Sequence, residues 1–235
     1  LEYYIWKNYV SLNMPKMLYF DDYHLLPGKI NLPDLHRKVQ AAEQKQFVLT
    51  DADKTAVSLL QIAGVNLEKL LEPTGYEEIR AKLEAISNSI TDKIFQYWRQ
   101  NKELDVEFDI RADPKDQAPF NNGNNLYIRI KNRRHRVSVP FDQRSKGFIW
   151  FFSFIVWFDS VKQQLGTKND LVLLLDEPGL SLHALAQEDF LKYIDDLSKN
   201  HQILYTTHSP FMVPTDRFDR IRMVEDRPEE GTKIT

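Results

Sequence analysis

The stretch from Leu171 to Pro178 places five consecutive apolar residues directly before two adjacent carboxylates, Asp176 and Glu177. An apolar run of this length is typical of a strand that is buried on both faces in a parallel sheet. Ionised carboxylates at the end of a buried strand cost free energy unless they meet water, a metal ion or a hydrogen-bonding partner. The stretch therefore predicts a sheet edge at which a cation binds, most often Mg²⁺ with a nucleotide.

A second strand is predicted over residues 202–207, and His208 follows it directly. The helical pattern over about 182–198 lies between the two strands, so the three elements form a crossover that makes the strands parallel. Because such sheets bind ligands at the carboxyl ends of their strands, we expect His208 at the same edge as Asp176. An imidazole there can donate to a phosphate oxygen or hold an attacking water; a structural histidine is the alternative.

Ser145 and Gly147 stand just before a run, residues 148–161, that is apolar on all sides. Such a run predicts a helix in the centre of the core, and it is too short to cross a bilayer. Free N–H groups at the start of a helix attract anions, which makes Ser145 and Gly147 a candidate phosphate cradle. An ordinary helix cap is the alternative, because serine is favoured at that position too.

The part of the chain before residue 101 is mainly helical in pattern. Its strongest helix spans about 76–99 and has one apolar face, which predicts either a projecting arm or an ordinary packed hairpin. Thr74 and Glu77 have the spacing of a capping box at the start of this helix. Asp51 and Asp53 are expected to begin an earlier helix, because acidic residues are favoured near a helix N-terminus.

Alternating apolar residues predict further strands on both sides of this helical region. They indicate a core strand over residues 17–20 and three antiparallel strands over residues 106–110, 126–130 and 136–139. Asp21, Asp22 and His24 follow the first of these strands. They could form a metal cluster, although a loop after a strand is the simpler interpretation.

Four short motifs occur in the order Arg144-Ser145-Lys146-Gly147, Asp176-Glu177-Pro178, Ser181-Leu182-His183 and Thr207-His208-Ser209-Pro210. They resemble the signature, Walker B, D-loop and switch-histidine motifs of ABC-type ATPases. Within the RecF, SMC and OLD branch, they are most similar to the OLD-like AAA ATPases. The resemblance implies an α/β fold: the P-loop NTPase-like parallel sheet of an ABC ATPase head, with a helical insertion and a small antiparallel β element.

Four parts of the chain are expected from these patterns and from the resemblance. They are an N-terminal piece of the ATPase core (1–30), a helical insertion (31–104), an antiparallel β element (105–143), and an ATPase lobe that carries the signature, Walker B, D-loop and switch histidine (144–235).

A division of labour is expected among the two carboxylates and the histidine. Asp176 would hold Mg²⁺ through a water, and Glu177 would accept a proton from the water that attacks the γ-phosphate. The resemblance implies that these two residues and His208 act on the ATP held by their own subunit. The implied reaction is Mg²⁺-dependent hydrolysis of ATP to ADP and phosphate.

The resemblance also implies a head that dimerises around ATP. Ser145 and Gly147 would contact the γ-phosphate bound by the opposite subunit, and Ser181 and His183 would belong to the D-loop. The expected partner is a second ATPase head in a homo-oligomer. This branch is linked to DNA repair and phage defence, so DNA and a separate nuclease or effector subunit are further candidate partners. No nuclease activity is assigned to the residues of this sequence.

The sequence departs from the family pattern in three places. The signature keeps only the serine and the second glycine of Leu-Ser-Gly-Gly, and the D-loop ends in His183 instead of aspartate. No G-x-x-x-x-G-K-[ST] loop, the Walker A motif, occurs anywhere in the sequence. Because the chain starts at Leu1 without an initiator methionine, we expect this loop in a segment outside the sequence or on another chain. The chain alone is then expected to bind ATP poorly.

Two other functions stay open at this point. A non-catalytic scaffold or dimerisation module would keep the head motifs after a genuine loss of nucleotide binding. An unrelated metal-dependent phosphohydrolase would use Asp176 and Glu177, but the sequence offers no further carboxylates or histidines at suitable spacing.

Charge and cysteine content add expectations about partners and compartment. The net charge of −3 hides a basic run at residues 129–136. Lys131, Arg133, Arg134 and Arg136 are candidate contacts to a DNA backbone, and a solvated charged hairpin is the alternative. The absence of cysteine excludes disulfides and thiolate metal sites and fits a reducing compartment, so the cytoplasm is the expected location, with no membrane partner.

Overall fold

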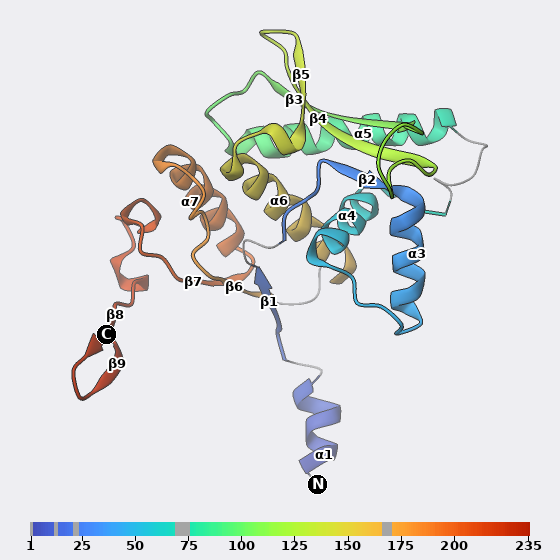
Figure 1. The fold of residues 1–235 in the computed structure, drawn as a ribbon. Coiled ribbons are helices and arrows are strands. Elements are labelled where there is room, and N and C mark those ends of the chain that lie inside the picture. Colours follow the sequence, from blue (N-terminus) through green and yellow to red (C-terminus); the bar gives the residue numbers. More distant parts are fainter. Residues whose placement is uncertain (1, 12–13, 21–23, 69–75, 166–170) are drawn as a thin grey trace.

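The computed structural model describes residues 2–11, 14–20, 24–68, 76–165 and 171–235. It is a mixed α/β structure with a parallel sheet and an antiparallel sheet. In Figure 1 the antiparallel sheet lies at the top, the parallel sheet lies lower, and the long helix α6 lies between them. The predicted α/β class with a parallel sheet is therefore confirmed.

The parallel sheet has the strand order β1–β6–β7. Its strands are β1 (Lys16–Phe20), β6 (Leu171–Leu175) and β7 (Gln202–Tyr205). Phe20 pairs with Leu175, and Leu175 pairs with Tyr205, so the three strands end in line at one edge. Helix α7 (Ala184–Ser198) connects β6 to β7 and forms the crossover that the sequence predicts.

Helix α6 (Lys146–Leu165) is the predicted central helix, and it is buried on nearly all sides along most of its length. The ring of Phe154, in its middle, lies 4.9 Å from the ring of Phe20 on β1 and 5.2 Å from that of Phe190 on α7. Both are edge-to-face contacts, which stabilise beyond the apolar area that they bury. The parallel sheet and α7 are thus held against the same helix. Within the described residues, no helix is long and apolar enough to span a membrane.

The antiparallel sheet has four strands, one more than the sequence analysis predicts. They are β2 (Lys29–Asn31), β3 (Leu104–Ala112), β4 (Asn124–Asn132) and β5 (Val137–Pro140). β4 pairs with each of the other three strands. The three predicted strands are confirmed, whereas β2 is too short to show an alternating pattern. The predicted domain boundaries stay predictions, although β2 now joins residues before position 31 to this sheet.

Among the described residues, three helices lie between β2 and β3: α3 (Leu32–Glu43), α4 (Asp51–Ile62) and α5 (Tyr76–Tyr97). Thr50 and Asp53 form a capping box at the start of α4, as expected for its acidic first turn. Helix α5 lies along the antiparallel sheet, where the backbone N–H of Val106 donates to Thr91 Oγ1 at 3.0 Å. It is therefore a packed helix and not a projecting arm. Thr74, the predicted cap of α5, lies outside the described residues.

Short elements complete the described structure; most of them lie toward the two ends of the chain. They are α1 (Glu2–Ile5), a π-helical turn (Trp6–Val10), three 3₁₀ turns (Phe141–Gln143, Pro210–Met212 and Phe218–Arg220), and the hairpin of β8 (Val224–Arg227) and β9 (Gly231–Ile234). Figure 1 shows α1 projecting away from the packed elements. Residues 3–5 of α1 and the hairpin are exposed, so these end elements lie outside the core.

We expect Phe154→Ala to lower the free energy of unfolding by about 3–5 kcal/mol, because it removes a fully buried ring from the contact between β1, α6 and α7. Chemical denaturation followed by circular dichroism measures the loss. Phe218→Ala is the matched control, because Phe218 is 68% exposed, and it should change stability by less than about 0.5 kcal/mol. Equal losses in the two variants would show that α6 is not the centre of the core.

Candidate functional site

The ends of β6 and β7 bring the predicted acidic pair to one edge of the parallel sheet. Thr206 continues the ladder, since its backbone N–H donates to the carbonyl of Leu175 at 3.0 Å. The Thr206 hydroxyl donates to Asp176 Oδ1 at 2.6 Å and accepts from the backbone N–H of Glu177 at 2.9 Å. One threonine therefore orients both acidic residues. Sequence analysis misses this role, although the in-register pairing of the strands places Thr206 opposite Asp176.

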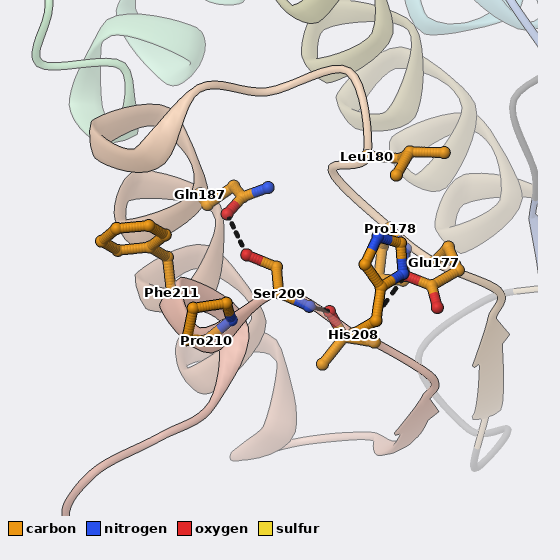
Figure 2. A pocket seen from close by; sticks show the side chains of 9 residues that line it. Glu177, Pro178, Leu180, Gln187, His208, Ser209, Pro210 and Phe211 are labelled. Atoms are coloured by element: carbon orange, nitrogen blue, oxygen red, sulfur yellow. Dashed lines mark hydrogen bonds and ion pairs between the residues drawn. The ribbon is translucent and has the colours of Figure 1, made fainter.

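His208 lies at the same sheet edge as Asp176, as the crossover predicts, and it is in direct contact with Glu177 (Figure 2). Glu177 Oε2 lies 2.9 Å from His208 Nδ1 and accepts from the backbone N–H of His208 at 3.3 Å. The side chain of Glu177 is 35% exposed and that of His208 is 70% exposed. The pair is thus fixed from one side and open to solvent on the other, where a ligand can reach it.

The turn after β6 has an unusual backbone. Glu177 has a φ of 45° and Gly179 a φ of 81°. A non-glycine residue in the left-handed region carries strain that the surrounding structure must hold in place. The bonds from Glu177 to Thr206 and His208 supply that restraint. The strained residue is also the one whose carboxylate faces His208, so strain and candidate chemistry coincide at one position.

A pocket of about 260 Å³ lies beside the Glu177–His208 pair. It is enclosed by the turn after β6, by the segment after β7 and by the start of α7 (Figure 2). The lining residues are Glu177, Pro178, Leu180, Gln187, Thr207, His208, Ser209, Pro210 and Phe211. Polar and apolar side chains both line the pocket, so it offers hydrogen-bonding groups together with apolar surface.

The donors present at this edge fit a magnesium ion that a nucleotide helps to hold. Mg²⁺ in phosphate sites is bound by one or two carboxylates, by substrate phosphates and by water, and does not need a cage of protein ligands. Asp176 is an exposed carboxylate that the Thr206 hydroxyl already orients. Among the described residues, no group of three or more acidic or histidine side chains could hold a metal ion by itself. Asp21 and Asp22 lie outside the described residues.

Ser145 and Gly147 lie at the start of α6, as predicted. Ser145 Oγ accepts a hydrogen bond from the backbone N–H of Phe148 at 3.3 Å, so the serine caps the helix. A Cβ atom on Gly147 would lie 2.7 Å from the carbonyl oxygen of Ser181. The start of α6 thus packs closely against residues 181–183 of the same chain, the predicted D-loop, and only glycine leaves room for that contact. The contact of these two residues with a phosphate stays a prediction.

The predicted D-loop, residues 181–183, also contacts the residues just after α5. His183 stands at the N-cap position of α7, where its ring contacts the Gln100 side chain through Nε2. The next residue toward α5, Arg99, donates its backbone N–H to Asp189 Oδ2 at 3.0 Å and its guanidinium to Oδ1. Asp189 is only 1% exposed, so a buried carboxylate on α7 is neutralised from α5. These contacts fix the start of α7 beside the site.

The candidate DNA contacts lie at the end of β4 and in its turn into β5. Two of them form ion pairs within the antiparallel sheet. Lys131 forms an ion pair with Glu107 at 2.9 Å, and Arg133 forms one with Asp105 at 3.1 Å. The hydrogen bond to Glu107 raises the pKa of Lys131. Arg134 and Arg136 are exposed in the turn. The ion pairs favour the solvated hairpin, and DNA contact by these residues stays a prediction.

Curated relatives resemble parts of this chain. An uncharacterized protein of Methanocaldococcus jannaschii is 37% identical over 105 residues, which are 44% of this chain and 27% of that protein. The OLD nuclease of Thermus scotoductus is 30% identical over 131 residues, which are 54% of this chain and 23% of the nuclease. The chain spans about a quarter of the length of these relatives.

Solved structures with a similar arrangement include heads of SMC proteins. An SMC head domain with an extended coiled coil from Pyrococcus furiosus, bound to the C-terminal domain of ScpA, has a TM-score of 0.44 and 18% identity, and covers 87% of this chain and 47% of its own. The SMC head domain from Thermotoga maritima has a TM-score of 0.41 and 14% identity, and covers 68% and 49%.

The family itself is established by sequence. A model of the family described as the AAA ATPase domain matches residues 11–213, which include both sheets, α6 and the whole Glu177–His208 site. The ATPase domain that the four motifs predict is thereby confirmed, and the similarity to an OLD nuclease agrees with the predicted resemblance. The chain belongs to the AAA ATPase domain family.

Proposed function

We propose that this chain is the ATP-hydrolysing part of an ATPase head, which binds ATP with Mg²⁺ and cleaves the γ-phosphate. The observation that carries the proposal is the contact between Glu177 and His208 at the carboxyl edge of the parallel sheet, 2.9 Å across, beside a pocket. Ligands bind at this edge in α/β folds. A carboxylate and an imidazole in contact there are suited to orient a water and accept its proton.

Glu177 is proposed as the general base and His208 as its catalytic partner. When Nδ1–H of His208 donates to the Glu177 carboxylate, Nε2 of the neutral ring is an acceptor that can orient the attacking water. The protonated ring would instead donate from Nε2 to a phosphate oxygen. Both roles use the exposed side of the histidine, while its other nitrogen keeps the ring oriented against Glu177.

Asp176 is proposed to hold Mg²⁺ through a water, with its carboxylate oriented by Thr206. When bound, the ion neutralises charge on the phosphate groups. The phosphates also need a loop of the G-x-x-x-x-G-K-[ST] type, which the printed 235 residues do not contain. We propose that residues outside this sequence supply the loop. If they do not, the chain is the non-catalytic scaffold or dimerisation module that is our second hypothesis.

We further propose that two heads dimerise around ATP, with Ser145 and Gly147 contacting the nucleotide of the opposite subunit. Support comes from the position of both residues at the start of α6, where N–H groups favour an anion, and from the exposure of Ser145 there; Gly147 is buried. Ser181 and His183 lie next to this helix start and would form part of the same interface. DNA and a separate nuclease or effector subunit are proposed further partners, in DNA repair or phage defence in the cytoplasm.

We expect Glu177→Gln to slow ATP hydrolysis by about 10²–10⁴-fold, because glutamine cannot accept the proton of the attacking water. ATP affinity should be nearly unchanged, since glutamine keeps the size of the side chain and its acceptor oxygen. Phosphate release and equilibrium binding of a fluorescent ATP analogue, in the full protein with its phosphate loop, measure the two quantities. Glu230→Gln, in the exposed turn between β8 and β9, is the control. Loss of binding equal to the loss of hydrolysis would contradict the role of Glu177.

We expect Ser145→Arg to abolish the ATP-dependent dimer, because a long side chain would occupy the space of the opposite nucleotide. Light scattering after size-exclusion chromatography measures the mass of the full protein with ATP, in the Glu177→Gln background that prevents turnover. Since arginine also removes the helix cap, Ser145→Asp serves as a second variant that keeps a cap and adds a repelling charge. Ser89→Arg on the exposed side of α5 is the control. Unchanged dimers in both Ser145 variants would exclude the contact between subunits.

A further inference from the structure

The geometry points to Gln187 as a positioning residue that couples the loop of His208 to the turn that follows Glu177. The inference rests on the proposed function, because it concerns how the same two catalytic groups are kept in contact. None of the four sequence motifs includes Gln187, which lies on α7 and lines the pocket (Figure 2).

The Gln187 side chain uses both ends of its amide group. Its Nε2 donates to the carbonyl oxygen of Gly179 at 2.9 Å, and its Oε1 accepts from the hydroxyl of Ser209 at 2.6 Å. The residue is only 7% exposed. The hydrogen bond to Gly179 is buried and that to Ser209 is partly buried, and such bonds are costly to lose because the groups left behind are shielded from water. The amide is therefore a fixed bridge.

The two ends of this bridge lie next to the two groups that the proposed reaction uses. Gly179 is two residues after Glu177, and Ser209 directly follows His208. The bridge thus connects the turn after Glu177, through α7, to Ser209 and His208. The 2.9 Å contact between Glu177 and His208 is a second, direct connection between the same two segments. A shift at Gln187 would move one catalytic group relative to the other.

Only a side chain with one donor and one acceptor can form this bridge. Methionine has a similar length but neither group, so Gln187→Met removes both hydrogen bonds without leaving a large cavity. Asp176 does not depend on the bridge, since the Thr206 hydroxyl orients it. We therefore expect Gln187→Met to lower kcat by about 10–100-fold through misplacement of the catalytic pair, with little change in KM for ATP.

The test compares Gln187→Met with Gln163→Met in the full protein. Gln163 is exposed near the end of α6, so the control has the same chemical change away from the site. Steady-state hydrolysis gives kcat and KM. Hydrogen–deuterium exchange without nucleotide gives a second readout: the backbone amides of residues 177, 179–180 and 207–209 should exchange faster in Gln187→Met and at the wild-type rate in the control.

Ser209→Ala removes one half of the bridge and is a milder variant that tests the same inference if Gln187→Met fails to fold. It should lower kcat as well, and the double variant should be no slower than Gln187→Met alone, because both changes break one connection. Wild-type kcat and wild-type exchange in Gln187→Met, or fully additive losses in the double variant, would overturn the inference. If the wild-type protein neither binds nor hydrolyses ATP, the proposed function fails instead, and the exchange data still decide whether Gln187 holds the two loops.

Discussion

The in-register pairing of β6 with β7 is the constraint on which the candidate site depends. Leu175 lies opposite Tyr205, so the residues that follow the two strands leave the sheet side by side. The Thr206 hydroxyl then donates to Asp176, and the residue after Asp176, Glu177, contacts His208. A slip of the pairing by a single residue would turn each side chain to the other face. The geometry of the site is therefore a direct consequence of how the core strands pair.

Core packing fixes that pairing, and much of the core follows from the pattern of apolar residues. The strand β6, the central helix α6 and the crossover helix α7 are long or strongly apolar, so periodicity alone predicts them. The three residues of β2 carry too little pattern, and its pairing with β4 becomes visible only in three dimensions. The same limit applies to α5: one apolar face predicts burial, but it does not say whether a partner in this chain provides it.

The site divides in a similar way between what the sequence predicts and what it does not. Asp176, Glu177 and His208 stand out because each follows an apolar run that ends at the same sheet edge. Thr206 lies inside the run that predicts the strand, so the pattern does not mark it as a site residue. Gln187 is one polar residue in a helix of ordinary pattern, and its partners lie 8 and 22 positions away. Residues that hold a site through contacts distant in sequence leave no local signal.

The end of α5 and the start of α7 belong to one packed body, and a buried charge shows why. Asp189 on α7 is almost fully covered, and an isolated carboxylate at such depth would be costly. Arg99, just after α5, donates hydrogen bonds to this carboxylate from its backbone N–H and from its guanidinium. The neighbouring Gln100 contacts the ring of His183. The end of α5 therefore has to stay beside the start of α7, which is also where Gln187 begins its bridge to the loops of Glu177 and His208. Polar contacts at the start of α7 thus link the position of α5 to the geometry of the candidate site.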